Sequence, residues 1–525
     1  MSGSIFIKKP LDLLMKEAGE TGENSLKRSL GPVSLVSLGV GAIIGAGIFV
    51  LTGAAAAKYA GPAIVLSFIL AGIGCVFAGL CYAEFASLIP IAGSAYTYGY
   101  ATLGELFAWI IGWDLILEYA FGAATVASGW SGYFTSLLQD FGIHIPPSLM
   151  ATPGADLVLY KDHWQLLSNL TDTLKTANID PSTLQHATGS FNVVAFVAIC
   201  LVTTVLVIGI KESASLNNAI VMLKVSIVLV FIGVAGYFVL HHPEIASKNW
   251  HPFIPPNTGN FGEYGWSGVA RGAGVIFFAY IGFDAVSTAA QETKNPQRDM
   301  PIGILGSLVI CTVLYIAVSG LLTGVVSYTA LNVPDPVAVG VDATGVGWAF
   351  MVGSHLIRVS SLMVKLGAVA GLGSVMLVML LGQSRVFFSM AHDGLLPKWA
   401  GKIHPRFRTP YISTIFVGIF VAFFAAVIPI SILGELVSIG TLLAFVIVCA
   451  GVWVLRKRRP DLHRPFRTPM VPLVPILGII VSVALMASLP GNTWIRLVVW
   501  LAIGMVIYFG YGRSHSRVGN PELYK

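Results

Sequence analysis

Six ionisable side chains lie inside long apolar runs of this 525-residue chain: Glu84, Asp114, Glu118, Lys224, Asp284 and Lys365. Burying a charge at membrane depth is costly, so residues of this kind mark function by default. Lys224 is the clearest case, because it lies about two turns inside an otherwise apolar segment with no acidic residue nearby in sequence. Loss of water disfavours the charged form of a lysine, which would let this side chain exchange a proton near neutral pH. The structural alternative is a permanent ammonium that caps the last carbonyls of an interrupted helix.

The other ionisable residues admit both functional and structural interpretations. Asp114 and Glu118 are four residues apart and therefore share one helical face, although Asp114 also suits a position at the membrane interface. Glu84 precedes Pro90 by six residues, which places it near the cytoplasmic end of its span. Lys365 lies about ten residues into its span, from where its long side chain can reach outward to water.

Glycines are the second chemical signal. Within nine residues the first span contains four of them, Gly39, Gly41, Gly45 and Gly47. Each glycine in a helix costs about 1 kcal/mol relative to alanine, which favours a break. The spacing of Gly41 and Gly45 also suits close packing of two helices, so the first span alone leaves both explanations open.

A second glycine-rich segment, 272–284, favours the break, because it lies at the equivalent position if spans 1–5 and 6–10 are inverted repeats. Paired interrupted helices of this kind point to a transport site. Unwound backbone at the bilayer midplane offers free N–H groups to a carboxylate and free carbonyls to an ammonium. We therefore predict that span 1 is interrupted around 44–47 and span 6 around 278–282, with a zwitterionic amino acid between them.

The bulk composition requires a membrane bundle to carry these residues. Hydrophobic residues make up 55% of the chain and charged residues 11%, against roughly a quarter charged in a soluble domain. About a dozen runs approach the ~20 apolar residues that cross a bilayer. We predict an all-α integral membrane protein of about 12 transmembrane helices, with a 5+5 inverted repeat, broken helices 1 and 6, and two further helices.

The predicted organisation is one transporter membrane domain between two tails. Its parts are an N-terminal tail (1–32), a first repeat (about 33–240) with an external loop (about 139–190), a second repeat (about 266–455), extra helices (about 469–512) and a C-terminal tail (513–525). About 22 of the 31 Lys and Arg residues fall on the side of the two tails. The positive-inside rule therefore places both tails in the cytoplasm, with the chain in the cell membrane. The small and aromatic residues 90–101 suit an amphipathic cytoplasmic element lying on the bundle.

Other functional classes find little support. All five cysteines lie in apolar runs, so we expect neither disulfides nor a metal site, and no cofactor. No cluster of nucleophile, base or metal ligands lies near the mouth of a span, which argues against an enzyme. The basic residues from Arg456 to Arg467 are better explained as a topological anchor than as a nucleic-acid or lipid patch.

A set of motifs spread from about residue 28 to 512 carries a family resemblance. They are Gly41-Ala-Ile-Ile-Gly-Ala-Gly-Ile-Phe49, Pro90 with Ala92-Gly93-Ser94, Gly112-Trp-Asp-Leu-Ile-Leu-Glu-Tyr119, Asn217-Asn218 through Lys224, Phe278-Ala-Tyr-Ile-Gly-Phe-Asp284 followed by Glu292 and Asn295-Pro-Gln297, and Asp393-Gly-Leu-Leu-Pro397. The chain resembles the amino acid-polyamine-organocation (APC) superfamily, and within it the cationic amino acid transporter family. It departs from the usual pattern at Gln291, where a second acid is common, and at His392, where arginine is common. Both departures bear on cytoplasmic gating contacts.

The resemblance implies the same inverted-repeat fold and a substrate site at the two broken helices. The substrate carboxylate is expected to meet the backbone of Gly45, Ala46 and Gly47. Its ammonium is expected to meet the carbonyls of four residues, Ile43, Phe278, Ala279 and Ile281.

The resemblance also implies a coupling mechanism. Lys224 matches the position where proton-coupled relatives place a lysine instead of a metal cation, between spans 1, 5 and 8. Glu118 and Asp284 fall where family members have buried acids, and they are candidates for proton relay or substrate contact. We therefore predict proton-coupled symport of amino acids into the cytoplasm by alternating access, with the amino acid, protons and the lipid bilayer as partners. A proton-independent uniporter or exchanger of cationic amino acids, with a structural Lys224, is the alternative, followed by an amino acid sensor.

Overall fold

The computed structural model of the chain describes residues 5–10, 30–89, 91, 94–160, 163–209, 214–352, 355–407 and 409–520. Most of the predicted N-terminal tail and the end of the C-terminal tail lie outside these ranges, as do the motif residues Pro90, Ala92 and Gly93.

Within the described ranges, eight helical stretches are long and apolar enough to span a membrane, and four shorter apolar helices accompany them. The main elements are α2 (Pro32–Ile43), α4 (Ile64–Leu88), α6 (Glu105–Ile116) with α7 (Gly122–Asp140), α9 (Val193–Ile208), α10 (Ala214–His241), α12 (Gly265–Ile276), α13 (Pro296–Val325), α15 (Val359–His392), α16 (Tyr411–Val427), α17 (Ile430–Arg458), α18 (Leu473–Ser488) and α19 (Gly491–Ile507). When the parts of each interrupted helix are taken together, they form twelve spans in the described part of the chain. The predicted all-α, 12-helix architecture is confirmed.

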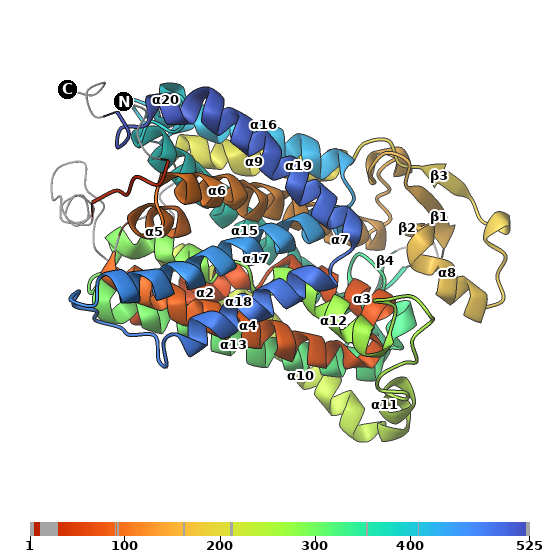
Figure 1. Ribbon diagram of the computed structural model, residues 1–525. Helices are drawn as coiled ribbons and strands as arrows, with labels where there is room; N and C mark the ends of the chain where they lie inside the picture. The colour runs from red at the N-terminus through yellow and green to blue at the C-terminus, as the bar shows by residue number, and fades with distance from the viewer. Residues whose placement is uncertain are drawn as a thin grey trace.

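Neighbouring spans pack side by side in the bundle. α13 lies along α2 and α4, while α15 lies along α7, and α16 along α9. Glu105, the first residue of α6, connects to both described ends of the chain. Its backbone N–H donates to the carbonyl of Ile7, and its carboxylate accepts from the Ser516 hydroxyl. The opposite end of the bundle carries β1–β3 and α8 (Figure 1). The chain ends and the long loop therefore lie at opposite ends of the bundle.

The first span is interrupted where its glycines cluster. α2 begins with Pro32 in its first turn, where a missing N–H leaves no hydrogen bond unmade. The helix ends at Ile43, and Ile44 has an extended backbone with a ψ of 96°. Helical structure resumes as the π-helix Gly47–Leu51. This interruption confirms the break predicted around residues 44–47.

The sixth span is interrupted in the same manner. α12 tightens into the 3₁₀-helix Phe277–Tyr280, and Ile281 then has an extended backbone with a ψ of 136°. Gly282 follows with a φ of +116°, a conformation that is open to glycine and strained for other residues. A second 3₁₀-helix, Asp284–Glu292, completes the span. The break predicted around residues 278–282 is therefore confirmed.

The segment after α4 differs from its prediction. Residues 94–102 form a helix, α5 (Ser94–Thr102), but all nine of its residues are buried. α5 packs against α6 and α17, so it is inserted into the bundle and does not lie on its surface. Small and aromatic side chains without charge can fill such a space on every side, which is why the expectation of an amphipathic face was wrong.

The predicted external loop contains a small folded lid. Its strands β1 (Asp156–Tyr160), β2 (His163–Leu166) and β3 (His186–Thr188) form an antiparallel sheet of order β2-β1-β3, in which Leu157 pairs with Leu166 and with Ala187. Helix α8 (Leu167–Thr176) covers the sheet, and three buried side chains form a separate core, Val158, Leu170 and Leu174. A second hairpin, β4 (Ala349–Val352) with β5 (His355–Arg358), precedes α15.

Candidate functional site

The two helix interruptions lie directly against each other. A Cβ added to Gly47 would lie 2.3 Å from the Cα of Ala279, and one added to Gly282 would lie 2.9 Å from the carbonyl carbon of Ala42. Glycine at positions 47 and 282 therefore allows the two unwound segments to touch. The fold brings together all seven residues predicted to bind substrate, and all are buried: Ile43, Gly45, Ala46, Gly47, Phe278, Ala279 and Ile281.

A tyrosine that the sequence analysis missed joins the two interruptions. Tyr315 of α13 is fully buried. Its hydroxyl lies 2.8 Å from the carbonyl oxygen of Ile43 and 2.8 Å from that of Ala279. A buried phenol needs a hydrogen-bond partner, so a tyrosine in the middle of an apolar span was the available signal for this contact.

Lys224 reaches the interruption of span 1 from α10. Its Nζ donates to the carbonyl oxygen of Gly41 at 2.7 Å and lies 3.4 Å from that of Ile44, and the side chain is fully buried. A Cβ at Gly371 would lie 3.1 Å from the Lys224 Cγ, so this glycine of α15 makes room for the lysine stem. The ammonium therefore lies between spans 1, 5 and 8, at the carbonyl end of α2. This placement agrees with both the coupling and the capping interpretation.

Glu118 and Asp284 come together from two different spans. Glu118 belongs to the π-helical turn Leu117–Phe121 of span 3, and Asp284 follows the interruption of span 6. The two buried carboxyl groups are close enough to affect each other's charge, although no hydrogen bond joins them in the described part of the chain. Asp284 Oδ2 accepts a hydrogen bond from the Tyr119 hydroxyl at 2.8 Å. Among the residues that the structure describes, the other three carboxyl oxygens have no hydrogen-bond donor.

Two of the remaining ionisable residues lie in unexpected surroundings. Asp114 is only 1% exposed, so it lies inside the bundle and does not face water or lipid. Both of its carboxylate oxygens lack a hydrogen-bond partner in the described part of the chain. Lys365 does not reach outward to water, because its Nζ lies 2.5 Å from Asp140 Oδ2 and 3.6 Å from Asp335 Oδ2. This buried ion-pair group ties the ends of spans 3 and 8 to the loop before α14 (Pro336–Thr344).

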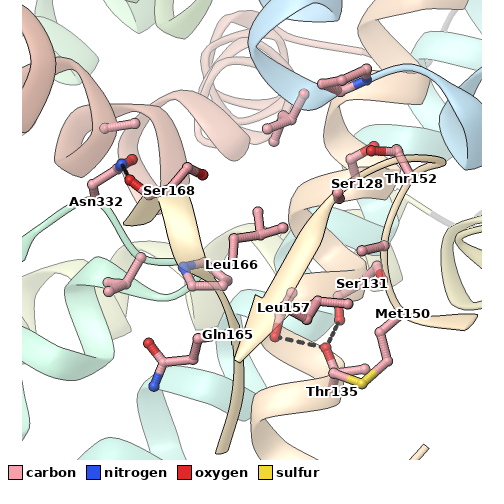
Figure 2. Close-up of a pocket in the computed structure, with 18 of the residues that line it drawn as sticks. Ser128, Ser131, Thr135, Met150, Thr152, Leu157, Gln165, Leu166, Ser168 and Asn332 are labelled. Atoms are coloured by element: carbon pink, nitrogen blue, oxygen red, sulfur yellow. Dashed lines mark hydrogen bonds between the residues drawn. The ribbon is translucent and has the colours of Figure 1, made fainter. Parts of the chain in front are cut away.

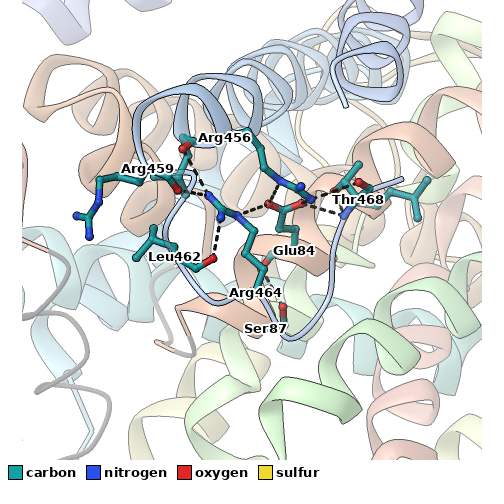
Figure 3. A network of polar contacts seen from close by, with 9 residues as sticks. Glu84, Ser87, Arg456, Arg459, Leu462, Arg464 and Thr468 are labelled. Atoms are coloured by element: carbon teal, nitrogen blue, oxygen red, sulfur yellow. Dashed lines mark hydrogen bonds and ion pairs between the residues drawn. The ribbon is translucent and has the colours of Figure 1, made fainter. Parts of the chain in front are cut away.

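Glu84 belongs to a structural network at the end of α4 (Figure 3). Arg456 donates to both of its carboxylate oxygens at 2.8 Å, and Arg464 donates to Oε1 at 3.1 Å. The backbone N–H of Thr468 adds a bond of 2.8 Å to Oε2. Four donors thus fix one buried carboxylate, and the network joins α4 to the end of α17 and to the loop before α18. Glu84 therefore holds the extra helices to the repeat domain.

We predict that Glu84→Gln destabilises the folded protein without changing transport by the molecules that fold. The variant keeps the side-chain size but leaves the buried guanidinium of Arg464 without its counter-charge, at a cost of roughly 3 kcal/mol. Thermal unfolding of the purified protein in detergent measures the loss. Asp461→Asn is the matched control, because its pair with Arg459 is more than half exposed on the Asp461 side and exposed ion pairs contribute little to stability. Equal shifts of the unfolding temperature in the two variants would contradict the structural role.

The two departures from the family pattern lie beside intact ion pairs. Next to Gln291, the Glu292 carboxylate pairs with Arg385 at 2.9 Å. Next to His392, the Asp393 carboxylate pairs with Lys9 at 2.9 Å and accepts from the Tyr96 hydroxyl at 2.8 Å. Ion pairs thus exist at both places, made by the neighbouring residues.

A cavity of about 660 Å³ lies between the spans and the lid. Side chains of α7, such as Ser128 and Thr135, face side chains of β2, such as Gln165, across it (Figure 2). Val50, one turn after the interruption of span 1, lies at its inner end. A Cβ at Gly129 would contact both Val50 and Ala46. The cavity is therefore a vestibule that reaches within one turn of the predicted substrate site without including it.

Comparisons with known proteins agree with this arrangement. The amino acid permease family matches residues 30–510. The branched-chain amino acid permease BcaP of Bacillus subtilis (strain 168) is 46% identical, over 99% of this chain and 100% of that protein. The methylthioribose transporter of the same organism is 44% identical, over 98% of this chain and 99% of that protein. The vacuolar cationic amino acid transporter 4 of Arabidopsis thaliana is 30% identical, over 95% of this chain and 94% of that protein.

Among solved structures, that of MhsT in complex with L-phenylalanine matches 91% of this chain and 99% of that chain, with a TM-score of 0.50 and 13% identity. At this identity the likeness concerns the fold alone, and it agrees with a multi-span helical bundle. The relatives and the fold point to the same conclusion: this chain belongs to the amino acid permease family of the APC superfamily.

Proposed function

We propose that the protein is a proton-coupled symporter that carries amino acids into the cytoplasm across the plasma membrane by alternating access. Its family consists of transporters and not of enzymes, and both the family model and a 46% identical relative are described as amino acid permeases. One observation carries the coupling: a buried lysine, Lys224, donates to the carbonyls at which span 1 breaks.

Protonation of Lys224 would control the inner half of span 1. The carbonyl end of α2 is the negative pole of the helix, so a charged ammonium stabilises it in place. A neutral amine holds the same carbonyls more weakly, because charge-assisted hydrogen bonds are roughly twice as strong as neutral ones. Proton uptake from outside therefore favours the closed arrangement around substrate. Proton release to the cytoplasm loosens α2 and opens the site inward.

The carboxyl pair of Glu118 and Asp284 offers a second proton-holding group in the same bundle. Two buried carboxylates that lie near each other repel strongly, so the pair is most stable when one of them holds a proton. Asp114 lies one turn from Glu118 toward the start of α6, where it would extend a path toward the end of the bundle at which the termini lie. These acids support proton exchange between the site and the cytoplasm.

An amino acid with a branched aliphatic side chain is the substrate we propose. Backbone N–H groups of residues 45–47 would bind its carboxylate, and carbonyls of the two interruptions would bind its ammonium. The nearest neighbours of this segment are apolar: a Cβ at Gly45 would meet Val375, and the Cβ of Ala46 faces Gly129. Apolar walls favour an aliphatic side chain over a cationic one, in line with the similarity to a branched-chain amino acid permease.

Two observations favour other functions. Lys224 already caps α2, so a permanent ammonium would make the protein a proton-independent uniporter or exchanger, including one for cationic amino acids. The similarity to a methylthioribose transporter makes that thiosugar a second candidate substrate. It has neither an α-carboxylate nor an α-ammonium to pair with the two interruptions.

Uptake by purified protein in liposomes tests the proposal. With the outside acidified, we expect labelled leucine to accumulate above its equilibrium level, and a protonophore should abolish the excess. Unlabelled valine and isoleucine should compete strongly, and arginine and methylthioribose weakly. Filling only to equilibrium would point to the uniporter or exchanger, while competition by arginine or methylthioribose but not by valine would reassign the substrate.

A further inference from the structure

Tyr315 lies where the two interrupted helices meet, and its contacts go beyond a packing role. We infer that Tyr315 is the positioning residue that shapes the ammonium subsite of the substrate and so sets the selectivity for an α-amine. This inference rests on the proposed function, since it concerns a substrate bound between the two interruptions.

The hydroxyl of Tyr315 joins one carbonyl from each interrupted span. Its oxygen lies 2.8 Å from the Ile43 oxygen at the end of α2 and 2.8 Å from the Ala279 oxygen in the 3₁₀ turn after α12. A hydroxyl has a single proton to donate, whereas each carbonyl oxygen has two acceptor positions. The two carbonyls therefore converge on one point and keep acceptor capacity for a further donor.

This convergence matches the chemistry of an ammonium. The Tyr315 hydroxyl oxygen lies 2.8 Å from both carbonyl oxygens, so these two oxygens are close enough together for one donor to reach both. A second donor can therefore bond to both carbonyls from another side. An ammonium has three N–H donors and so can bond to both carbonyls together, at the ~2.8 Å typical of charged donors. A substrate with a hydroxyl in place of the ammonium supplies one donor and leaves a buried carbonyl without its partner.

The surroundings of Tyr315 hold its hydroxyl in place. The ring lies 5.3 Å from that of Phe68 and 5.4 Å from that of Tyr280, measured between ring centroids, and the residue is fully buried. Tyr508, which follows α19, provides a control outside the site, because it is equally buried. Its hydroxyl donates at 3.0 Å to Glu105 Oε1 at the start of α6 and not to the interruptions.

Competition by two substrate analogues tests the inference in proteoliposomes that exchange labelled leucine. For Tyr315→Phe we expect the leucine KM to rise about tenfold, the scale of one lost buried hydrogen bond, while the maximal rate changes less than about twofold. The preference for leucine over 2-hydroxy-4-methylpentanoate, measured as the ratio of inhibition constants, should also fall about tenfold. Tyr508→Phe should leave this ratio unchanged.

An unchanged ratio in Tyr315→Phe would overturn the inference. A general packing defect would weaken leucine and the hydroxy acid equally and so leave the ratio as it is in the wild type. A wild-type protein that exchanges no amino acid would instead defeat the proposed function itself. Should Tyr315→Phe fail to insert, 3-fluorotyrosine placed at position 315 alone keeps the hydroxyl. Its fluorine resonance should then shift with leucine and not with the hydroxy acid, and equal shifts would overturn the inference.

Discussion

Gly47→Ala is expected to lower amino acid binding by at least about 30-fold while the protein stays inserted in the membrane. The added Cβ would lie 2.3 Å from both the Cα and the Cβ of Ala279. A backbone atom cannot rotate away, so the two interruptions must separate. Overpacking of this kind costs about 2 kcal/mol or more, which corresponds to roughly 30-fold in affinity. Equilibrium binding of labelled leucine to the purified variant measures the effect.

Gly233→Ala is the control for removing a glycine from a span. Gly233 lies within α10, and a Cβ there would meet no atom within 4 Å, so binding should be unchanged. Size-exclusion profiles should show both variants as intact, inserted protein. Normal leucine binding by Gly47→Ala would contradict a substrate site built on contact between the two interruptions.

Lys224→Ala is expected to abolish the stimulation of uptake by an inward proton gradient. The variant removes the titratable group at the break of span 1 and leaves the carbonyls of Gly41 and Ile44 without its ammonium. Exchange of labelled for unlabelled leucine should survive at a reduced rate, because exchange needs no net proton movement. Initial rates at equal pH and with an acidic outside solution give the comparison.

Lys224→Arg separates charge from titration at the same position. A guanidinium does not lose its proton in proteins, so this variant should stay charged and accumulate no substrate. Lys248→Ala, which removes an exposed lysine of the short helix α11 (Pro243–Asn249), should behave as the wild type. If Lys224→Ala kept full gradient-driven accumulation, the coupling would have to be reassigned, first to Glu118 and Asp284.

The interruptions were predictable because they depend on local sequence. Clustered glycines lower the helix propensity of one segment wherever it lies in the bundle, and Gly282 adopts a backbone conformation that favours glycine. The burial of Lys224 inside a span could also be predicted from the local sequence, since apolar residues surround it on both sides. Its contact with span 1 followed from the family resemblance and not from the spacing.

Partners from distant parts of the chain were not predictable. Glu84 pairs with Arg456, which is 372 positions away, and no local pattern joins the two. Tyr315 is 272 positions from Ile43 and 36 from Ala279, so its bridging role exists only once three spans have packed. The strands of the lid are also short, and their pairing depends on a core of three side chains.

Direct measurement of proton movement is the most decisive experiment. Liposomes containing the protein would enclose a pH-sensitive dye, with equal pH on both sides and the membrane potential clamped, and leucine would be added outside. We predict that the lumen acidifies as leucine enters through the wild type, and that Lys224→Ala gives no acidification while still exchanging labelled leucine. Leucine uptake by the wild type without acidification would contradict proton-coupled symport.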